Sequence, residues 1–587
     1  MNLLGVNSAY HESSACLLRD GLLLAAVEEE RFNRIKHGKK ARVDSADELP
    51  EAAMAYCLAA AGIGWSEIDH IAYSFDPEER LRKNVGLAEE PTLRPGDWGT
   101  AEGEKAFHAS NLRARKKLLE RAPRAGFHFV RHHLCHASSA FHVSPFEEAC
   151  VMAVDGIAEF ASTWLGVGRG SRLECLAEID YPSSLGFLWE KFSEFLGFDR
   201  YSGPGKVMGY SAITDPVGER GDDYLARLRE AVQLRPLGFT LDDRVFRFRA
   251  EGDFSGMERL FGPRHTRVVC RYEEASIASA LQAMTEDIMV HLARELHART
   301  AAQLGHAVDD LCLSGGVALN CLANAAILGR TPFKRLFVQP AANDAGTALG
   351  AAFWVWHEAL GNQRRASPME HAFWGPQYEE REMKAALEEK GLVGMRPDDL
   401  EREVARLLYD GALVARFAGR LELGPRALGN RSILGDPTRF DMREIINSKV
   451  KFRESFRPFA PSVLDSAMPA LFETRSPSPA DIMPADDYML LVYRTKERKH
   501  TLIPAVVQED EMRHVNTCRV QVVREKTNPS YYRLIQEFGA LSGVGAVLNT
   551  SFNIQEPIVC TPRDAVATFL GSRIDWLALG PFLVRRS

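Results

Sequence analysis

Two histidines four residues apart are the first residues in this sequence whose types and spacing could do chemistry. His132 and His136 lie in the stretch RHHLCHASSA, residues 131–140. On a helix, this spacing places both imidazoles on one face, about 6 Å apart at Cβ. Two neutral imidazoles so placed can bind one divalent cation, provided that oxygen ligands from elsewhere complete its shell. Asp155 and Asp344 are the candidates for those oxygen ligands.

A helix that is merely rich in histidine is the alternative explanation, since single motif matches are often accidental. Asp344 has an alternative as well, because an aspartate ahead of the small-residue run AANDAGTALGA commonly caps a helix. The zinc-protease pattern HExxH fits poorly, because His133 occupies the place of its glutamate. The metal interpretation therefore depends on whether the fold brings the aspartates to the histidines.

A second group of chemically capable residues lies toward the C-terminus, where cationic and aromatic side chains alternate in KVKFRESFRPF, residues 449–459. The cations are Lys449, Lys451, Arg453 and Arg457, together with Arg426 from the preceding GRLELGPRALGNRSIL. We expect the alternation to bury Phe452, Phe456 and Phe459 and to gather the cations on one side. Arginine grips phosphate with two hydrogen bonds, whereas lysine serves as a point charge. A small, doubly charged phosphate is the expected ligand.

A polar segment follows the apolar run of residues 544–548. We expect Asn549 and Ser551 to lie in a loop there, with amide and hydroxyl donors available to an oxyanion. An ordinary Asx or Ser turn explains the same residues equally well.

The elements that must position these groups form a repeated pattern. Apolar runs at residues 3–7, 13–18 and 22–28 predict a β-meander with an Asp-Gly hairpin turn, and runs at 150–154, 161–167 and 173–179 predict a second. Each meander feeds a helical stretch, which indicates a duplicated unit of the actin-like ATPase type. In a cleft between two such halves, phosphates can sit against turn amides such as that of Gly156. Two unrelated hairpins are the alternative.

Glycines after a further predicted strand, residues 311–314, favour a nucleotide nearby. Gly315 and Gly316 would let the backbone approach a ligand closely, and the helix opened by Asn320 would favour a phosphate or ribose at its N-terminus. Periodicity is lost between residues 357 and 378. We place a domain boundary there, giving domains of residues 1–365 and 366–587.

Composition limits the classes of partner. The 587 residues include 72 Lys+Arg and 79 Asp+Glu, so a net charge of -7 provides no general attraction for nucleic acid or an anionic membrane. The 10 cysteines form no CxxC pair, as expected of reduced thiols. Neither a basic leader nor an apolar run of roughly 18 residues is present, so we expect a cytoplasmic protein.

Eight ordered motifs connect the chain to a known family. HHLCHASSAF, VMAVDG, GKVMG, SGGVALNC, AANDAGTALGAA, GPRALGNRSIL, KFRESFRPFAPSVL and LNTSFN resemble the O-carbamoyltransferases that decorate antibiotics and nodulation factors. The resemblance implies an α/β protein with an N-terminal actin-like, ribonuclease-H-like domain and a smaller C-terminal domain of the carbamoyl-adenylate-forming type. It also implies that carbamoyl phosphate and ATP give carbamoyl-adenylate plus pyrophosphate. The carbamoyl group then passes to a hydroxyl of a small-molecule acceptor.

The resemblance also assigns residues to sites. A metal of the Fe2+ type, or another divalent ion, is implied at His132, His136, Asp155 and Asp344. Carbamoyl phosphate is implied at Arg426, Lys451, Arg457, Arg519, Asn549 and Ser551. ATP with Mg2+ is expected at Lys36, Gly156, Lys206, Gly209, Gly315, Gly316 and Asn320. The catalytic candidates are His11, for acceptor orientation or as general base, with Lys36 and Arg457.

Two departures from the family pattern concern the acceptor. After GKVMG the chain has Tyr210-Ser211-Ala212-Ile213-Thr214-Asp215 in place of Leu-Ala-X-Tyr-Gly, and Glu12 replaces a common aspartate. The alternatives are an actin-like small-molecule kinase, which would leave the C-terminal cations unused, and a partner in tRNA threonylcarbamoyl modification. The acidic charge balance argues against tRNA.

Overall fold

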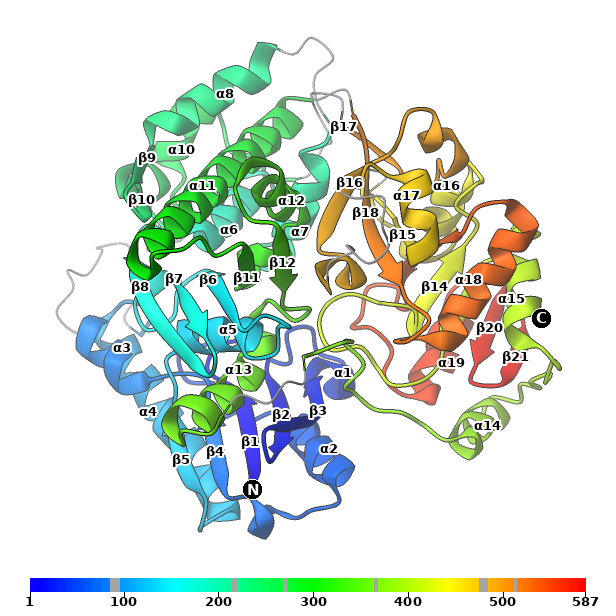
Figure 1. Cartoon of the computed structure of the whole chain (residues 1–587), viewed down its shortest axis with the longest axis horizontal. Helices are drawn as coiled ribbons and strands as arrows, with labels where there is room; N and C mark the ends of the chain where they lie inside the picture. Colours follow the sequence, from blue (N-terminus) through cyan, green and yellow to red (C-terminus); the bar gives the residue numbers. More distant parts are fainter. Residues whose placement is uncertain are drawn as a thin grey trace. The chain divides into compact units, whose positions relative to one another are not determined.

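A computed structural model describes residues 1–84, 96–213, 219–250, 252–267, 272–363, 368–454, 456–474, 484–510 and 515–586. The chain divides into two compact units, Met1–Met369 and Glu370–Ser587 (Figure 1). The predicted boundary between residues 365 and 366 lies outside the described residues.

The N-terminal unit contains the same five-stranded topology twice. In the first sheet, of order β3-β2-β1-β4-β5, an antiparallel meander continues into two parallel strands, and the order β8-β7-β6-β11-β12 repeats this arrangement. The first set is β1 (Asn2–Asn7), β2 (Ser14–Arg19), β3 (Leu22–Glu28), β4 (His70–Tyr73) and β5 (Gly126–Phe129). The second is β6 (Glu148–Val154), β7 (Ala161–Arg169), β8 (Arg172–Asp180), β11 (Asp310–Ser314) and β12 (Arg335–Val338). The prediction of a duplicated, ribonuclease-H-like α/β fold is confirmed.

Two helices that lie between these sheets explain how residues far apart in sequence meet (Figure 1). α5 (His132–Phe141) follows β5, and α13 (Thr347–Trp354) packs against it and against β1. A Cβ atom added to Gly350 would lie 1.7 Å from the carbonyl oxygen of Cys135, and one on Gly5 would lie 2.1 Å from that of Ala348. Glycine at both positions therefore permits the close approach that sets the helices in place.

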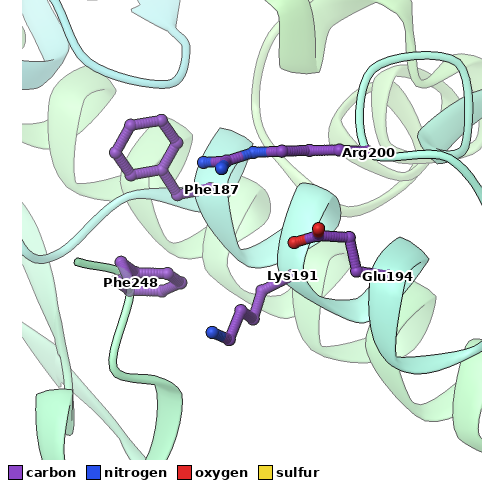
Figure 2. Close-up of a pocket in the computed structure, with 5 residues that line it drawn as sticks. All are labelled: Phe187, Lys191, Glu194, Arg200 and Phe248. Atoms are coloured by element: carbon purple, nitrogen blue, oxygen red, sulfur yellow. The ribbon is translucent and has the colours of Figure 1, made fainter. Parts of the chain in front are cut away.

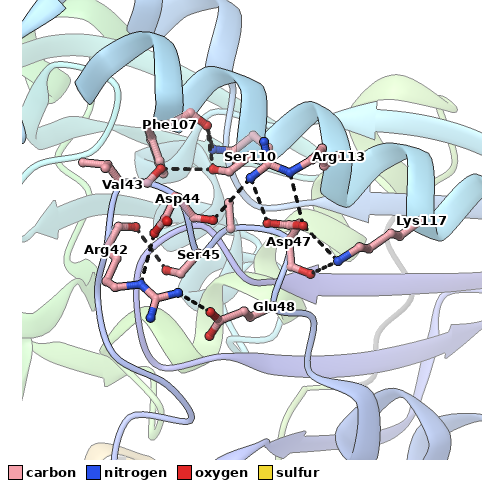
Figure 3. Close-up of polar contacts among 12 residues, drawn as sticks. Arg42, Val43, Asp44, Ser45, Asp47, Glu48, Phe107, Ser110, Arg113 and Lys117 are labelled. Carbon is pink, nitrogen blue, oxygen red and sulfur yellow. Dashed lines mark hydrogen bonds and ion pairs between the residues drawn. The ribbon is translucent and has the colours of Figure 1, made fainter. Parts of the chain in front are cut away.

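The remaining elements of this unit surround the two sheets. The loop of residues 42–48 is held to α4 (Ala101–Arg121) by Asp47, which pairs with Arg113 and Lys117 (Figure 3). The other helices include α1 (Glu30–Asn33), α2 (Glu51–Ala61), α3 (Pro77–Asn84), α6 (Leu185–Phe195), α7 (Pro204–Tyr210), α8 (Glu219–Glu230), α9 (Asp243–Phe246), α10 (Ser255–Phe261), α11 (Tyr272–Leu304) and α12 (Cys321–Arg330), and a hairpin joins β9 (Val232–Arg235) to β10 (Gly238–Leu241).

The C-terminal unit is built on a mixed sheet of order β16-β18-β15-β19-β14-β13-β20-β21, with β17 paired to β18. Successive residues of β13 point to opposite faces, so that Val414 packs with α15 and α18 whereas Ala415 packs with α14 and α19. Its strands are β13 (Val414–Phe417), β14 (Arg431–Gly435), β15 (Ala460–Leu464), β16 (Leu491–Arg494), β17 (Gln508–Asp510), β18 (Val515–Val523), β19 (Ala546–Ser551), β20 (Trp576–Leu579) and β21 (Phe582–Arg585). Its helices include α14 (Glu380–Glu388), α15 (Leu400–Tyr409), α16 (Met442–Ile446), α17 (Met468–Leu471), α18 (Pro529–Ser542) and α19 (Pro562–Gly571). Helices thus cover both faces, and the predicted smaller α/β domain is confirmed.

Two local predictions in this unit are wrong. Phe456 and Phe459 are buried as expected, but Phe452 is 58% exposed because its backbone takes a left-handed φ of 45° that ends a π-helical turn and breaks the alternation. Asn549 and Ser551 belong to strand β19 and not to a loop. Among the described residues, no helix is both long and apolar enough to cross a membrane.

Candidate functional site

The structure brings together the four residues predicted to bind a metal. His132 and His136 lie on the first two turns of α5, Asp155 follows β6, and Asp344 precedes α13. One nitrogen or oxygen atom from each residue lies within 4.8 Å of the others, in the one such group that the described residues form. The capping explanation for Asp344 does not account for this, since its carboxylate faces the histidines.

The spacing of these atoms fits a divalent ion. The Nε2 atoms of His132 and His136 are 3.1 Å apart, and the four nitrogen-to-carboxylate distances fall between 3.3 and 3.6 Å. Two ligands each about 2.1 Å from a common ion, at angles between octahedral and tetrahedral, stand roughly 3.0–3.4 Å apart. Two imidazoles and two carboxylates suit iron, manganese or zinc.

Groups behind these four residues orient them. The Nδ1 atom of His132 lies 3.2 Å from the carbonyl oxygen of Ser74, so that a proton on Nδ1 leaves Nε2 available to a metal. The N–H of Gly316 donates to Oδ1 of Asp155 at 2.8 Å. A Cβ on Gly316 would lie 2.9 Å from that oxygen, and one on Gly315 would lie 2.2 Å from the carbonyl of Val154. Gly316 therefore holds the Asp155 carboxylate directly, and Gly315 permits the close approach of the backbone to Val154, the residue before Asp155.

The electrostatics of the four residues are those of a buried cation site. Burial alone would lower the pKa of His132, but the Asp344 and Asp155 carboxylates outweigh it and raise that pKa well above its ordinary value. Burial alone would raise the pKa of Asp155, but hydrogen bonds and charge interactions with both histidines hold it well below its ordinary value. The site thus favours ionised carboxylates that face positive charge.

His11 stands on a turn that is tied directly to the same cluster. The side-chain amide nitrogen Nδ2 of Asn7, at the end of β1, donates to the backbone carbonyls of His11, Glu12 and Asp344 at 3.1, 2.9 and 3.1 Å. Nδ1 of His11 is buried and has no hydrogen-bond partner among the described residues. This role of Asn7 was not predicted; its signal in the sequence is an amide side chain at a strand end beside a polar turn.

A second histidine lies beside His11. The ring centroids of His11 and His37 are 6.0 Å apart, and His37 Nδ1 lies 2.7 Å from Oε1 of Glu12. Burial lowers the pKa of His37, but the Glu12 carboxylate outweighs this and raises it overall. The neighbouring Lys36, predicted to contact nucleotide and to take part in catalysis, is exposed.

The other predicted nucleotide residues lie on separate elements. Lys206 and Gly209 are on α7, half-buried and buried respectively. Asn320 caps α12 by accepting from the N–H of Ala323, and its amide donates to Gln282. These positions stay predictions.

A recess beside α6 was not predicted. Figure 2 shows its lining of Phe187, Lys191, Glu194, Arg200 and Phe248. Burial lowers the pKa of Lys191 to about 8. The recess adjoins the loop that carries Asp155, since a Cβ on Gly156 would lie 3.5 Å from Phe187.

The C-terminal unit gathers part of the predicted cation cluster. Burial first, and then the charges of Arg457 and Arg519, lower the pKa of Arg453 to about 9. Burial and Arg519 likewise lower the pKa of Arg457, against an opposing effect from Glu454. Lys449 does not join this group, because it pairs with Asp575 at 3.1 Å.

Lys451 and the residues of β19 form an adjoining polar network. The Lys451 ammonium donates to the carbonyl oxygens of Ser551 and Asn553 at 2.6 and 2.8 Å, and to Oδ1 of Asn553 at 2.7 Å. The Asn549 amide donates inward, to the carbonyl of Ala427 at 3.1 Å. Asn549 thereby holds the residue that follows Arg426 in sequence.

A buried glutamate that was not predicted from the sequence organises the loop that carries Arg426. Oε1 of Glu422 accepts from the N–H groups of Leu428, Asn430 and Arg431 at 2.8, 2.9 and 3.2 Å. Glu422 is 2% exposed. One carboxylate thus fixes the backbone of this loop from inside.

Comparison with known proteins places both units in one family. A model described as carbamoyltransferase N-terminus matches residues 2–353, and one described as carbamoyltransferase C-terminus matches residues 405–586. An uncharacterised protein of Synechocystis sp. strain PCC 6803 is 35% identical over 632 aligned residues, covering 100% of this chain and 97% of that protein. Nodulation protein NolNO of Sinorhizobium fredii is 35% identical over 99% of this chain and 80% of its own length. Nodulation protein NolO of Bradyrhizobium diazoefficiens is 36% identical over 78% of this chain and 79% of its own length.

Proposed function

The chain belongs to the carbamoyltransferase family, and we propose that it is an O-carbamoyltransferase that uses carbamoyl phosphate and ATP. In the proposed first reaction, water releases phosphate from carbamoyl phosphate, and the carbamate oxygen then displaces pyrophosphate from ATP to give carbamoyl-adenylate. In the second, the hydroxyl oxygen of a small-molecule acceptor attacks the carbamoyl carbon, AMP leaves, and the hydroxyl proton passes to a base.

The observation that carries the proposed first reaction is the group of Arg453, Arg457 and Arg519. Guanidinium groups that lower one another's pKa share a region of positive potential, which Glu454, 3.9 Å from Arg457, offsets only in part. Arginine grips phosphate with two parallel hydrogen bonds. A group of this kind supports a site for the phosphates of carbamoyl phosphate and ATP, with Mg2+ shared between them.

His132, His136, Asp155 and Asp344 are the residues that would hold a divalent metal, Fe2+ or a similar ion, in the N-terminal unit. Such an ion, when bound, acts as a Lewis acid toward a phosphoryl or carbonyl oxygen. The residues around it maintain the ligands: Ser74 fixes the tautomer of His132, and Gly316 orients Asp155.

His11 is the group proposed to orient the acceptor hydroxyl or to take its proton. Imidazole is the side chain that most often serves as a general base. The Asn7 side chain donates to the backbone carbonyls of both His11 and Asp344, which ties the turn that carries the imidazole to the four-residue cluster. The buried Nδ1 atom of His11 has an unused hydrogen-bonding site among the described residues.

Separate measurements of the two reactions test this proposal. Purified protein with carbamoyl phosphate, ATP, Mg2+ and Fe2+ is assayed for pyrophosphate, and hydroxylated metabolites are screened by mass spectrometry for a carbamoyl mass gain. Arg457→Ala should abolish pyrophosphate release, whereas His136→Ala should spare it and block transfer. Arg396→Ala, at an exposed surface ion pair, is the matched control and should change neither.

Two results would contradict the proposal. If Arg457→Ala and His136→Ala both stay folded and lose pyrophosphate release equally, the assignment of two separate reactions is wrong. Formation of ADP and a phosphorylated acceptor without carbamoyl phosphate would identify a small-molecule kinase on the same duplicated fold.

A further inference from the structure

Arg80, on α3, lies outside every site described above, and its guanidinium is nearly enclosed. It is 4% exposed, and its partner Glu104, on α4, is 1% exposed. The two side chains form a double hydrogen bond, Nε to Oε2 and Nη2 to Oε1, both at 2.7 Å. The N–H of Gly99 also donates to Glu104, at 2.9 Å.

The remaining nitrogen of Arg80 reaches both halves of the duplicated fold. Nη1 donates to the hydroxyl oxygen of Tyr10 at 2.6 Å and to the carbonyl oxygen of Ala158 at 2.5 Å. Tyr10 immediately precedes His11 on the turn of the first meander, and Ala158 lies on the turn of the second meander, three residues after Asp155. The hydroxyl of Tyr10 donates in turn to the carbonyl of Ala158 at 3.2 Å. One side chain therefore joins the two turns.

Aromatic rings enclose this contact. The Arg80 guanidinium carbon lies 5.8, 5.6 and 5.5 Å from the ring centroids of Tyr10, Trp98 and Phe107. The three rings also contact one another, with centroids 4.9 to 5.0 Å apart. The rings exclude water from the Arg80 guanidinium. Each of its hydrogen bonds is therefore stronger than in water, and the guanidinium has fewer orientations available.

Stability alone does not explain such a pair. Removing two charges from water costs about as much as their attraction returns, and apolar residues of similar volume often do as well or better. What a buried, fully bonded pair can supply is a single geometry. Here that geometry is the spacing between the turn that holds His11 and the turn that begins at Asp155.

We propose that Arg80 is a positioning residue for carbamoyl transfer: by joining Tyr10 to Ala158 it sets, together with the Asn7 amide, the distance between His11 and the four-residue metal cluster. This inference rests on the proposed function. Asp155 itself is held independently by the N–H of Gly316, so metal binding should depend little on Arg80.

The decisive variant replaces the whole pair by apolar residues, Arg80→Met with Glu104→Leu. Because both members of the double hydrogen bond leave together, and the nearby buried Glu159 keeps its backbone donors at Asp76 and His132, the protein should stay folded. Transfer to the acceptor should nevertheless fall at least tenfold. Pyrophosphate release that depends on carbamoyl phosphate should stay within threefold of the wild type, and so should the affinity of the four-residue cluster for Co2+, which serves as a spectroscopic probe of the metal site. Tyr10→Phe, which removes only the hydroxyl, should reduce transfer in the same direction.

The control is an exposed pair of the same composition. Arg121 and Glu51 also form a double contact beside an aromatic ring, with side chains 34% and 54% exposed, so Arg121→Met with Glu51→Gln should leave transfer unchanged.

A stable Arg80→Met, Glu104→Leu protein that transfers as fast as the wild type would overturn the positioning role. A Co2+ affinity that falls together with transfer would also overturn it, because the pair would then act on the metal ligands. A wild-type protein that transfers no carbamoyl group would instead refute the proposed function.

Discussion

Replacement of Glu422 tests whether one carboxylate organises the loop that carries Arg426. In Glu422→Ala, three buried N–H groups, now bonded at 2.8, 2.9 and 3.2 Å, lose their acceptor. Hydrogen bonds to a charged group contribute roughly 1.5–3 kcal/mol each, but three that share one oxygen are not additive. We expect a loss of about 4 kcal/mol in the free energy of unfolding of the C-terminal unit, which is large for one substitution.

Glu422→Gln separates hydrogen bonding from charge. The glutamine carbonyl can still accept from the three N–H groups, but the nearby Arg416 and Arg431 lose the negative charge that now faces them. We therefore expect an intermediate loss of about 2 kcal/mol, the difference between charged and neutral hydrogen bonds summed over this site.

Urea denaturation of the full chain, followed by peptide-resolved hydrogen exchange in β14, measures these losses. Glu389→Ala is the control, since Glu389 forms an exposed ion pair with Arg563 and should cost less than about 0.5 kcal/mol. Glu422→Ala and Glu389→Ala variants that agree within about 1 kcal/mol would refute the reasoning, because the interior hydrogen bonds would then contribute no more than a surface pair.

Other substitutions and a pH titration probe separate features. Gly316→Ala places a Cβ 2.9 Å from the Asp155 carboxylate and should weaken Co2+ binding about tenfold or more by spectroscopic titration, whereas Gly329→Ala, with nothing within 4 Å, should not. Burial lowers the pKa of Lys39 to about 7, so between about pH 7 and 10 the unfolded chain binds the proton more readily than the folded one. The free energy of unfolding in urea, measured relative to that of Lys39→Met, should therefore rise as the pH increases from about 7 to 10. A difference that does not change with pH would contradict this. Arg431→Met, which empties a guanidinium site that is 0% exposed and 3.7 Å from the Phe417 centroid, should cost about 3–5 kcal/mol in urea denaturation, and a loss below about 1 kcal/mol would show that its carbonyl partners find water instead.

The sequence predicted the parts of the fold that depend on local pattern. The Asp20-Gly21 turn takes positive φ at both positions, as an Asp-Gly hairpin requires, and the strands on either side pair as expected. His132 and His136 share a helix face because they are four residues apart and the predicted helix covers both. Asp344 meets them through packing of α13 on α5, which depends on Gly350 and which no local pattern reveals.

The features that the sequence did not predict depend on tertiary contacts. The alternation of cationic and aromatic residues in 449–459 predicts that all the cations lie on one face. The π-helical turn that ends before Phe452 breaks this alternation, so the side chains on either side of it no longer share a face. The roles of Asn7 and Glu422 escaped prediction for another reason. Each acts on backbone groups of other segments, and an amide or carboxylate in a turn gives the same sequence signal whether it points inward or outward.

The amide of Asn7 has a consequence for chemical ageing of the molecule. Deamidation to aspartate would exchange one nitrogen for oxygen, with almost no change in shape, in a side chain that is 1% exposed. The three carbonyl oxygens that accept hydrogen bonds from the Asn7 side chain would then face a negative charge, and the two turns they belong to would be pushed apart. A protein that has lost transfer on storage while keeping its fold should therefore be examined for a gain of one mass unit located at Asn7, by fragmentation of the first tryptic peptide, which also contains Asn2.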